Sequence, residues 1–284
     1  MATRTKIKLD PLRIDGREVG RVLITGASAG IGAELAREFA RHGHRLTLVA
    51  RRKDKLAALA RELDAEYHVD VKVIVQDLAR PTGPAAVVRA TQDEGDAIGI
   101  LVNNAGVIDV GPFVGAPVDK LVGMVNLNVR ALTELTGLLL PAMVERKFGR
   151  ILNVASLAAF QPVPGMAAYA ASKAYVLALS EALAEELKGS GVSVSALCPG
   201  VTDTDMAAEI KAGSSTAAKL PKELISDPRD VAERAYKALM AGQAVLVPGL
   251  PNQITAAWAQ VTPRWLTRYV TGIAARRSDW LKSS

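Results

Sequence analysis

A tyrosine and a lysine stand four residues apart in the apolar segment MAAYAASKAYVLAL, residues 166–179. On a helix, residues at this spacing project from one face, so Tyr169 and Lys173 are expected to be neighbours. A free phenol has a pKa of about 10, and a cation within about 4–6 Å lowers it by roughly one to three units. With a second positive charge beside it, the pKa of Tyr169 would approach roughly 7, where a general acid or base works best. Taken singly, each residue is more often explained by packing, which is how we interpret Tyr175 on another helix face.

A glycine-rich turn separates the first β-branched run from the first amphipathic segment, in RVLITGASAGIGAELAREF from residue 21. Glycines at this point allow a tight turn and close approach of the backbone to a pyrophosphate. The helix that follows offers N–H donors and the positive end of its dipole. The turn therefore predicts dinucleotide binding. Its predicted contact residues are Gly26, Ser28, Gly30, Ile31 and Gly32.

The end of the second predicted strand indicates which dinucleotide is bound. Ala50 is followed by Arg51 and Arg52, and no carboxylate stands there to bind a ribose hydroxyl. A charge-assisted contact between arginine and phosphate contributes about 1.5–3 kcal/mol, which is a preference of about tenfold to hundredfold. We therefore predict NADP(H) rather than NAD(H), with Arg51 on the 2′-phosphate. The alternative is that both arginines only begin a solvated helix.

Short apolar runs alternate with longer Ala-, Leu- and Glu-rich segments along most of the chain. The predicted strands are 21–25, 45–50, 71–76, 99–103, 150–155, 192–198 and 244–248. The predicted helices are roughly 30–42, 53–65, 84–93, 117–147, 165–189 and 228–241. Continuous apolar strands indicate that both faces of a sheet are covered. We expect an α/β, Rossmann-type, doubly wound parallel sheet of about seven strands with helices on both faces.

Three regions are expected within the 284 residues. Residues 1–20 form a polar arm, 21–250 a single dinucleotide-binding and catalytic domain, and 251–284 an extension rich in aromatic and basic residues. The segment of about 201–226 has the Gly, Ser and Pro content of a mobile lid over a substrate.

Composition excludes several classes of protein. The formal net charge is +6, but the charges lie in mixed-sign helical segments, so no nucleic acid partner is expected. A single cysteine, Cys198, rules out an internal disulfide and fits a reducing compartment. We see no secretory signal and no uninterrupted apolar stretch long enough to span a bilayer, and we expect a cytoplasmic location. No metal site is predicted.

Further motifs follow the glycine turn in a fixed order. They are NNAG at 103–106, LNV at 127–129, Ser156 after RILNVA, YAASK at 169–173 and PGVTDT at 199–204. From about residue 20 to 248 the chain resembles the short-chain dehydrogenase/reductase family. It looks most like a bacterial, NADP-preferring subgroup whose substrates are mostly unassigned.

The resemblance implies further cofactor contacts. Asp77 and Leu78 would contact adenine, and Asn104 would lie against the cofactor between its two nucleotide halves. Thr202 and Thr204 would lie where the chain passes over the nicotinamide and its carboxamide. The sequence departs from some NADP-preferring relatives at Ala29, where they carry a basic residue, so Ser28 is expected to assist Arg51.

The resemblance also implies a catalytic tetrad of Asn128, Ser156, Tyr169 and Lys173. In hydride transfer from NADPH to a carbonyl carbon, Tyr169 would protonate the oxygen, and the oxidised nicotinamide ring would be the second positive charge. The Ser156 hydroxyl would stabilise charge growing on that oxygen. Lys173 would also hold the nicotinamide ribose hydroxyls, and Asn128 would hold a water that links Lys173 to solvent. The same groups would serve the reverse oxidation.

The segment LAAFQPVPGMAAY after Ser156 is expected to line the substrate pocket, with Leu157, Phe160, Val163 and Met166 available. It contains no arginine to bind a carboxylate, so we expect a hydrophobic ketone, aldehyde or acyl-type substrate.

The extension 251–284 holds all three tryptophans and several arginines, with Trp265 and Tyr269 on one helical face. This composition suits a subunit interface or a cover over the pocket, and it also suits peripheral contact with an anionic membrane. A solvated tail is the remaining alternative. The family resemblance implies a homodimer or homotetramer built on the helices 117–147 and 165–189. Two rival functions are a non-catalytic NADP(H)-sensing protein and a membrane-associated scaffold. The first would normally have lost one of the four tetrad residues, and the second leaves the tetrad unexplained.

Overall fold

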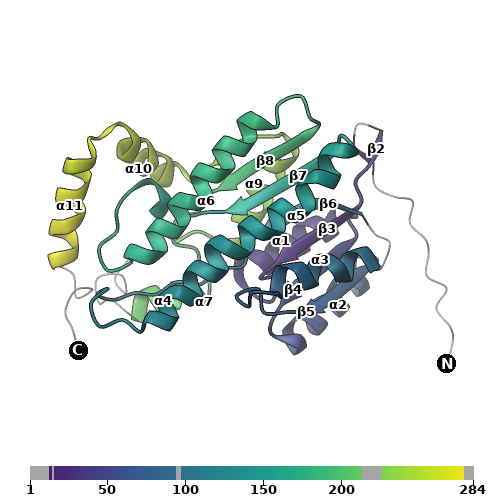
Figure 1. The fold of residues 1–284 in the computed structure, drawn as a ribbon, viewed down its shortest axis with the longest axis horizontal. Coiled ribbons are helices and arrows are strands. Elements are labelled where there is room, and N and C mark those ends of the chain that lie inside the picture. The colour runs from purple at the N-terminus through teal and green to yellow at the C-terminus, as the bar shows by residue number, and fades with distance from the viewer. Residues whose placement is uncertain (1–12, 15, 94–96, 213–224, 278–284) are drawn as a thin grey trace.

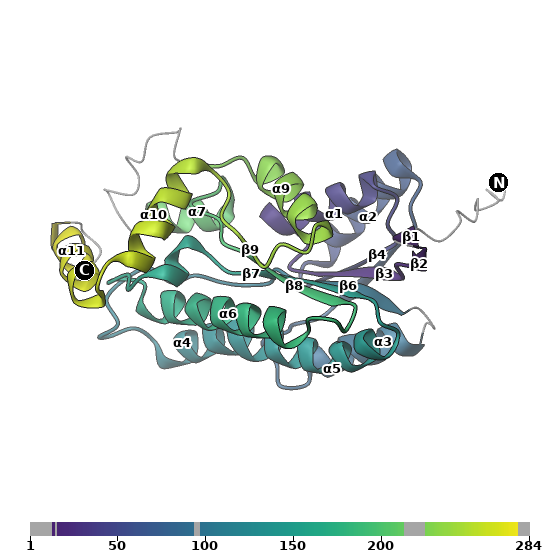
Figure 2. The same ribbon diagram turned by 90° about the horizontal axis from the view of Figure 1, so that it is seen from above.

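The computed structural model of the chain describes residues 13–14, 16–93, 97–212 and 225–277. A parallel sheet lies between two layers of helices (Figures 1 and 2). One layer consists of α1 (Gly30–Arg41), α2 (Lys53–Tyr67) and α9 (Pro228–Met240). The other consists of α3 (Gly83–Asp93), α4 (Val118–Val125), α5 (Leu132–Glu145) and α6 (Ala167–Glu186).

The main sheet has seven strands within the described residues, in the order β5-β4-β3-β6-β7-β8-β9, and every pairing is parallel. The strands are β3 (Arg21–Thr25), β4 (Leu46–Ala50), β5 (Val71–Val75), β6 (Ile98–Asn103), β7 (Gly149–Val154), β8 (Val192–Leu197) and β9 (Val245–Leu246). The chain runs outward from β3 to β5 and then returns to the other side of β3 with β6. Ligands of such sheets bind at the carboxyl ends of the strands where the order reverses. The predicted fold class is confirmed.

The central strands are mostly apolar because the two sides of each strand enter different cores. On β3, Val22 and Ile24 pack into the cluster that contains Phe39 of α1. Leu23, which points the opposite way, packs into the cluster that contains Leu135 of α5. Alternating side chains of a strand project to opposite faces of the sheet, so both faces bury apolar area.

The long helix predicted over 117–147 is interrupted. α4 and α5 are separated by a π-helical turn, Asn126–Ala131, which carries Asn128 at 1% exposure. By length and composition alone, Val118–Glu145 would suffice to cross a membrane. It is the core helix of this fold, since Leu135, Leu139 and Met143 share a cluster with residues of β6 and β7.

The described parts of the predicted arm, lid and extension contain regular structure that the sequence analysis did not specify. Within the predicted polar arm, β1 (Arg13–Ile14) and β2 (Arg17–Glu18) form an antiparallel pair, and Val19 is buried in the main core. The predicted lid begins with α7 (Asp205–Ala212), and its residues 213–224 lie outside the described residues. The extension forms two helices, α10 (Leu250–Val261) and α11 (Arg264–Arg277).

A cluster of aromatic rings joins α1 to α9. His44, 1% exposed, contacts Tyr236 through an Nε2–Oη distance of 3.1 Å, and its ring lies edge-on to Phe39 at 5.2 Å. His42 stacks on the other side of Tyr236 and contacts the Glu38 carboxylate. Burial, with a smaller effect from His42, lowers the pKa of His44 from 6.5 to about 4.

We predict that the free energy of unfolding falls as the pH drops from 6.5 towards 4. In this window the unfolded chain protonates its histidine while the folded chain excludes the proton, and the loss for His44 reaches about 3 kcal/mol at most. Chemical denaturation at several pH values should show a flatter profile for His44→Gln than for the wild type. His68→Asn, at an exposed left-handed position where asparagine is well tolerated, is the control. If the free energy of unfolding of His44→Gln fell with pH as steeply as that of the wild type, the attribution of this pH dependence to His44 would be contradicted.

Candidate active site

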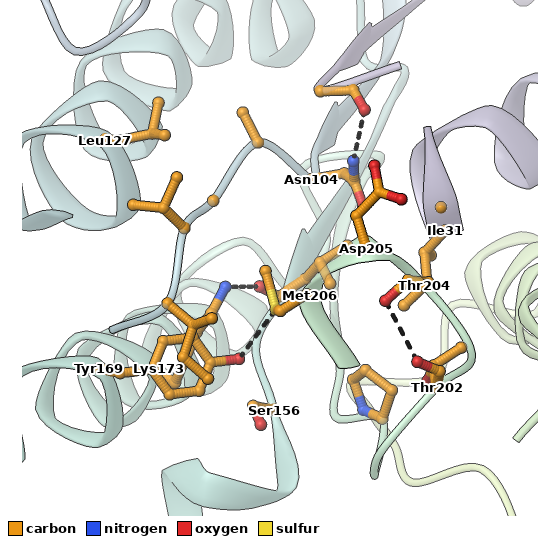
Figure 3. A pocket seen from close by; sticks show the side chains of 18 of the residues that line it. Ile31, Asn104, Leu127, Ser156, Tyr169, Lys173, Thr202, Thr204, Asp205 and Met206 are labelled. Carbon is orange, nitrogen blue, oxygen red and sulfur yellow. Dashed lines mark hydrogen bonds between the residues drawn. The ribbon is translucent and has the colours of Figure 1, made fainter. Parts of the chain in front are cut away.

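A cavity of about 570 Å³ opens at the carboxyl ends of the central strands (Figure 3). Its wall includes Gly26 after β3, Asn104 after β6, Ser156 after β7 and Pro199 after β8. This is where the order of the strands reverses, and the volume lies within the range of about 300–1,000 Å³ found for ligand sites.

The glycine turn lies at one end of this cavity and is shaped by close backbone contacts. Gly26 has a φ of +67°, and a Cβ atom there would lie 2.8 Å from the Cα of Ala105. A Cβ atom on Gly32 would collide with the Asn104 side chain. Side chains at these two positions would therefore push β3 away from β6.

The amino end of α1, just after this turn, is open towards the cavity. Ala29 precedes the helix without a side-chain cap, and the first turn contains no acidic residue. The free N–H groups and the helix dipole favour an anion at this point. The turn and the helix end therefore fit a pyrophosphate.

Asn104 ties the two central strands together at the cavity floor. Its side-chain amide donates to the carbonyl of Thr25 at 2.9 Å, and its backbone N–H donates to Thr25 Oγ1 at 3.0 Å. Asp77 and Leu78 lie on the same wall, where Asp77 Oδ1 accepts a hydrogen bond from the backbone N–H of Ala79 at 3.0 Å.

Arg52 links the turn to the predicted lid, a connection that the sequence analysis did not anticipate. Its Nε donates to Ser28 Oγ at 3.1 Å, and its guanidinium lies 3.5 Å from the carboxylate of Asp205, the first residue of α7. Arg51 also lines the cavity and is exposed. Both arginines are thus available to an anion beside Ser28.

Lys173 and Tyr169 lie together at the opposite end of the cavity, on α6 (Figure 3). Lys173 is 4% exposed and donates from Nζ to the carbonyl of Val154 at 2.8 Å. Its Nζ lies 5.8 Å from the centre of the Tyr169 ring. Burial lowers the pKa of Lys173 to about 8, so the ammonium group is still mostly protonated at pH 7.

The pKa of Tyr169 moves in the opposite direction from the sequence prediction. In the protein without a bound coenzyme, burial raises the pKa of this phenol, and a hydrogen bond with Ser156 lowers it by a smaller amount. Desolvation penalises the charged phenolate more than Ser156 favours it. The expected lowering concerned the complex with a positively charged ring beside Tyr169, and for that complex it stays a prediction.

Asn128 lies behind the cavity wall and anchors the loop after β6. Its Oδ1 accepts from the backbone N–H of Val107 at 3.0 Å, and its amide donates to the Val107 carbonyl at 2.9 Å and to Ser172 Oγ at 3.1 Å. Gly106 separates it from Lys173, since a Cβ atom there would lie 3.3 Å from Asn128 Oδ1 and 3.4 Å from Lys173 Nζ. The predicted water relay is a separate role and stays a prediction.

The wall around Tyr169 is apolar. Leu157, Val163 and Met166 line it as expected, and Met206 of α7 approaches Tyr169 with an Oη–Sδ distance of 3.9 Å (Figure 3). The expectation for Phe160 is wrong. It ends the short 3-10 helix η2 (Leu157–Phe160) and packs instead against the cluster around Val176 and Cys198.

The structure brings most of the predicted site residues to this one cavity. Those that line it are Gly26, Ser28, Gly30, Ile31, Arg51, Asp77, Leu78, Asn104, Ser156, Tyr169, Lys173, Thr202 and Thr204. Gly32 and Asn128 do not line the cavity. Gly32 lies against Asn104 and Asn128 is hydrogen-bonded to Val107, and both of those neighbours line it. Within the described residues, no cluster of His, Cys, Asp or Glu could hold a metal ion.

The sequence analysis missed Arg52, Asp205 and Met206 as site residues. Arg52 was visible only as the neighbour of Arg51. For Asp205 and Met206 no periodicity or spacing indicates a position over the cavity.

Comparison with known proteins agrees with this geometry. Residues 20–215 match the family described as short chain dehydrogenase. Oxidoreductase UcpA of Salmonella typhimurium is 39% identical over 253 residues, which cover 84% of this chain and 94% of the relative.

Two solved structures share the fold over most of both chains. A short-chain dehydrogenase from Sphingobium yanoikuyae in complex with NADPH has 38% identity and a TM-score of 0.75, and the match covers 90% of this chain and 94% of that one. A bulky-bulky ketone specific alcohol dehydrogenase from Comamonas testosteroni has 32% identity and a TM-score of 0.72, and here the match covers 91% and 95%. The chain is therefore an enzyme of the short-chain dehydrogenase/reductase family.

Proposed function

We propose that this enzyme is an NADP(H)-dependent oxidoreductase that interconverts a hydrophobic ketone, aldehyde or acyl-type carbonyl with its alcohol. The observation that carries the proposal is the arrangement of a single cavity. The glycine turn and two arginines lie at one end, and Ser156, Tyr169 and Lys173 lie at the other. The NADPH complex of the Sphingobium relative supports the choice of coenzyme.

The coenzyme supplies the hydride, and the residues of the chain manage the charge on the substrate oxygen. The Tyr169 hydroxyl donates its proton to that oxygen, and the Ser156 hydroxyl donates a hydrogen bond to it. The ammonium group of Lys173, still mostly protonated at neutral pH, stabilises the phenolate left on Tyr169. In the oxidation direction Tyr169 accepts the proton instead.

The wall beside Tyr169 supports an apolar substrate. Leu157, Val163, Met166 and Met206 line this part of the cavity. No Arg or Lys stands between Leu157 and Met166 to bind a carboxylate. The bulky ketone specificity named for the Comamonas relative agrees with such a wall.

We further propose that the enzyme works in the cytosol as a homodimer or homotetramer, with the helices around α5 and α6 at the interface. Exposed Val122 and Val125 on α4, Leu138 on α5 and Tyr175 on α6 support this pairing. Single, buried Cys198 agrees with a reducing compartment.

A panel of apolar ketones and aldehydes with NADPH, followed by the absorbance of the coenzyme, tests the function directly. We expect turnover with bulky apolar carbonyls and little with small carboxylated ones, because the wall offers apolar contacts and no cation between Leu157 and Met166. A preference for carboxylated substrates would contradict the proposed substrate class.

Tyr169→Phe should lower kcat by about a hundredfold to ten-thousandfold, because it removes the proton donor. NADPH binding, measured by fluorescence titration, should survive. Tyr175→Phe is the matched control, since Tyr175 lies on another face of α6, where its hydroxyl contacts Thr133 Oγ1 at 2.9 Å. Tyr169 would lose its assigned role if the two variants behaved alike.

Arg51→Ala and Arg52→Ala should each weaken NADPH binding by about tenfold or more and leave NADH binding nearly unchanged.

Asp205→Asn should strengthen NADPH binding by up to about fivefold, since it frees Arg52 from an exposed ion pair. Asp203→Asn, an exposed neighbour, is the control. If the two arginine variants weakened NADPH and NADH binding equally, the assignment of the arginines to the 2′-phosphate would be contradicted. If Asp205→Asn bound NADPH as tightly as the wild type, Asp205 would not compete with the phosphate for Arg52.

A further inference from the structure

The outward face of α10 is apolar, where a surface helix usually carries polar residues. Ala256 is buried and marks the side of α10 that packs on the protein. Leu250, Ile254, Trp258 and Val261 lie on the opposite side and are 69%, 63%, 40% and 81% exposed. At 100° per residue, these four positions fall within one narrow stripe.

α11 continues this pattern. Thr267 and Ala275 are buried and mark its inner side. Trp265, Tyr269 and Val270 lie on the outer side and are 64%, 61% and 42% exposed. We call these exposed residues of the two helices the C-terminal apolar surface. It consists of Leu250, Ile254, Trp258, Val261, Trp265, Tyr269 and Val270.

The charged side chains of α10 and α11 themselves all have one sign. Arg264, Arg268 and Arg276 are exposed on α11, and residues 250–277 contain no Asp or Glu. A two-fold contact between copies would bring the same patch of each together. The arginines would then face each other with no carboxylate of their own patch to pair with. The composition therefore favours an anionic partner over a second copy.

The surface lies at one end of the molecule, with α11 at its outermost edge (Figures 1 and 2). α10 also touches the wall of the active-site cavity. A Cβ atom on cavity-lining Gly200 would lie 2.6 Å from Asn252 Oδ1 of α10. A ligand bound along the C-terminal apolar surface is thus close to the apolar side of the active site.

We propose that the C-terminal apolar surface binds peripherally to an anionic lipid bilayer, which supplies an apolar substrate to the neighbouring cavity. Tryptophan and tyrosine side chains enter the interfacial region of a bilayer, and flanking arginines pair with lipid phosphates. The binding itself does not require the proposed function, because it depends on residues outside the active site. The delivery of substrate does rest on that function.

The 284-residue chain contains its own fluorescent probe, since all three of its tryptophans, at 258, 265 and 280, lie in the extension 251–284. Mixing the protein with phosphatidylcholine vesicles that contain phosphatidylglycerol should shift the tryptophan emission to the blue and sediment the protein. Vesicles of phosphatidylcholine alone should bind at least about tenfold more weakly, and added salt should release the protein. These readouts do not depend on turnover, so a failure of the proposed function would leave them interpretable.

Two double variants separate the contribution of the aromatic side chains to vesicle binding from that of the arginines. Trp265→Ser with Tyr269→Ser should abolish sedimentation, and Arg264→Gln with Arg268→Gln should weaken it by about tenfold or more. Val75→Ser, an exposed apolar residue on β5 at the opposite edge of the sheet from β9 and α10, is the control and should bind like the wild type.

Failure of the wild type to bind the anionic vesicles would overturn the proposal. So would equal binding to both kinds of vesicle with no effect of the arginine substitutions. A lower oligomer mass in Trp265→Ser with Tyr269→Ser, measured by light scattering, together with no vesicle binding by the wild type, would assign the surface to a subunit interface instead.

Discussion

The candidate active site is built around an ammonium group that the fold keeps away from water. Lys173 is almost fully buried, and its Nζ donates to the Val154 carbonyl at the end of β7. Burying a charge is costly unless it is hydrogen-bonded or paired, and here the cost appears as a pKa lowered to about 8. The group nevertheless stays mostly protonated at neutral pH. Burial also disfavours the charged form of Tyr169, so it raises the pKa of that phenol, and the hydrogen bond with Ser156 and a positive charge nearby act against this rise. Burial disfavours the charged form of both side chains, so a charge on either one is favoured by the opposite charge on the other.

Backbone geometry that is rare elsewhere holds this pair in place. The π-turn Asn126–Ala131 directs Asn128 inward, where its amide binds both backbone groups of Val107 and also Ser172 Oγ on α6. π-helical turns inside α-helices occur often at functional sites. Here the turn fixes the loop after β6 to α6, the helix that carries Tyr169 and Lys173. Asn128 thus positions the site whether or not it also holds a water.

The sequence predicted features that depend on local patterns, and it failed where distant segments meet. Apolar runs predicted the parallel sheet, and the glycine turn predicted the tight turn after its first strand, because each pattern reports burial or backbone freedom in its own segment. The spacing of Tyr169 and Lys173 likewise predicted their common helix face. The contact of Arg52 with Asp205, and that of Tyr169 with Met206, join elements far apart in the chain. Phe160 was misplaced because a 3-10 turn, not visible in composition, directs it to the core.

Those two long-range contacts meet in consecutive residues of α7. Asp205 contacts Arg52 at the glycine-turn end of the cavity, and Met206 contacts Tyr169 at the catalytic end (Figure 3). Because both residues belong to one helical turn, the first turn of α7 contacts Arg52 and Tyr169 at the same time. Arg52 also donates to Ser28, so an anion beside Ser28 would compete with the Asp205 carboxylate for the same guanidinium. The first turn of α7 therefore bridges the two ends of the cavity, although no local pattern in the sequence places it there.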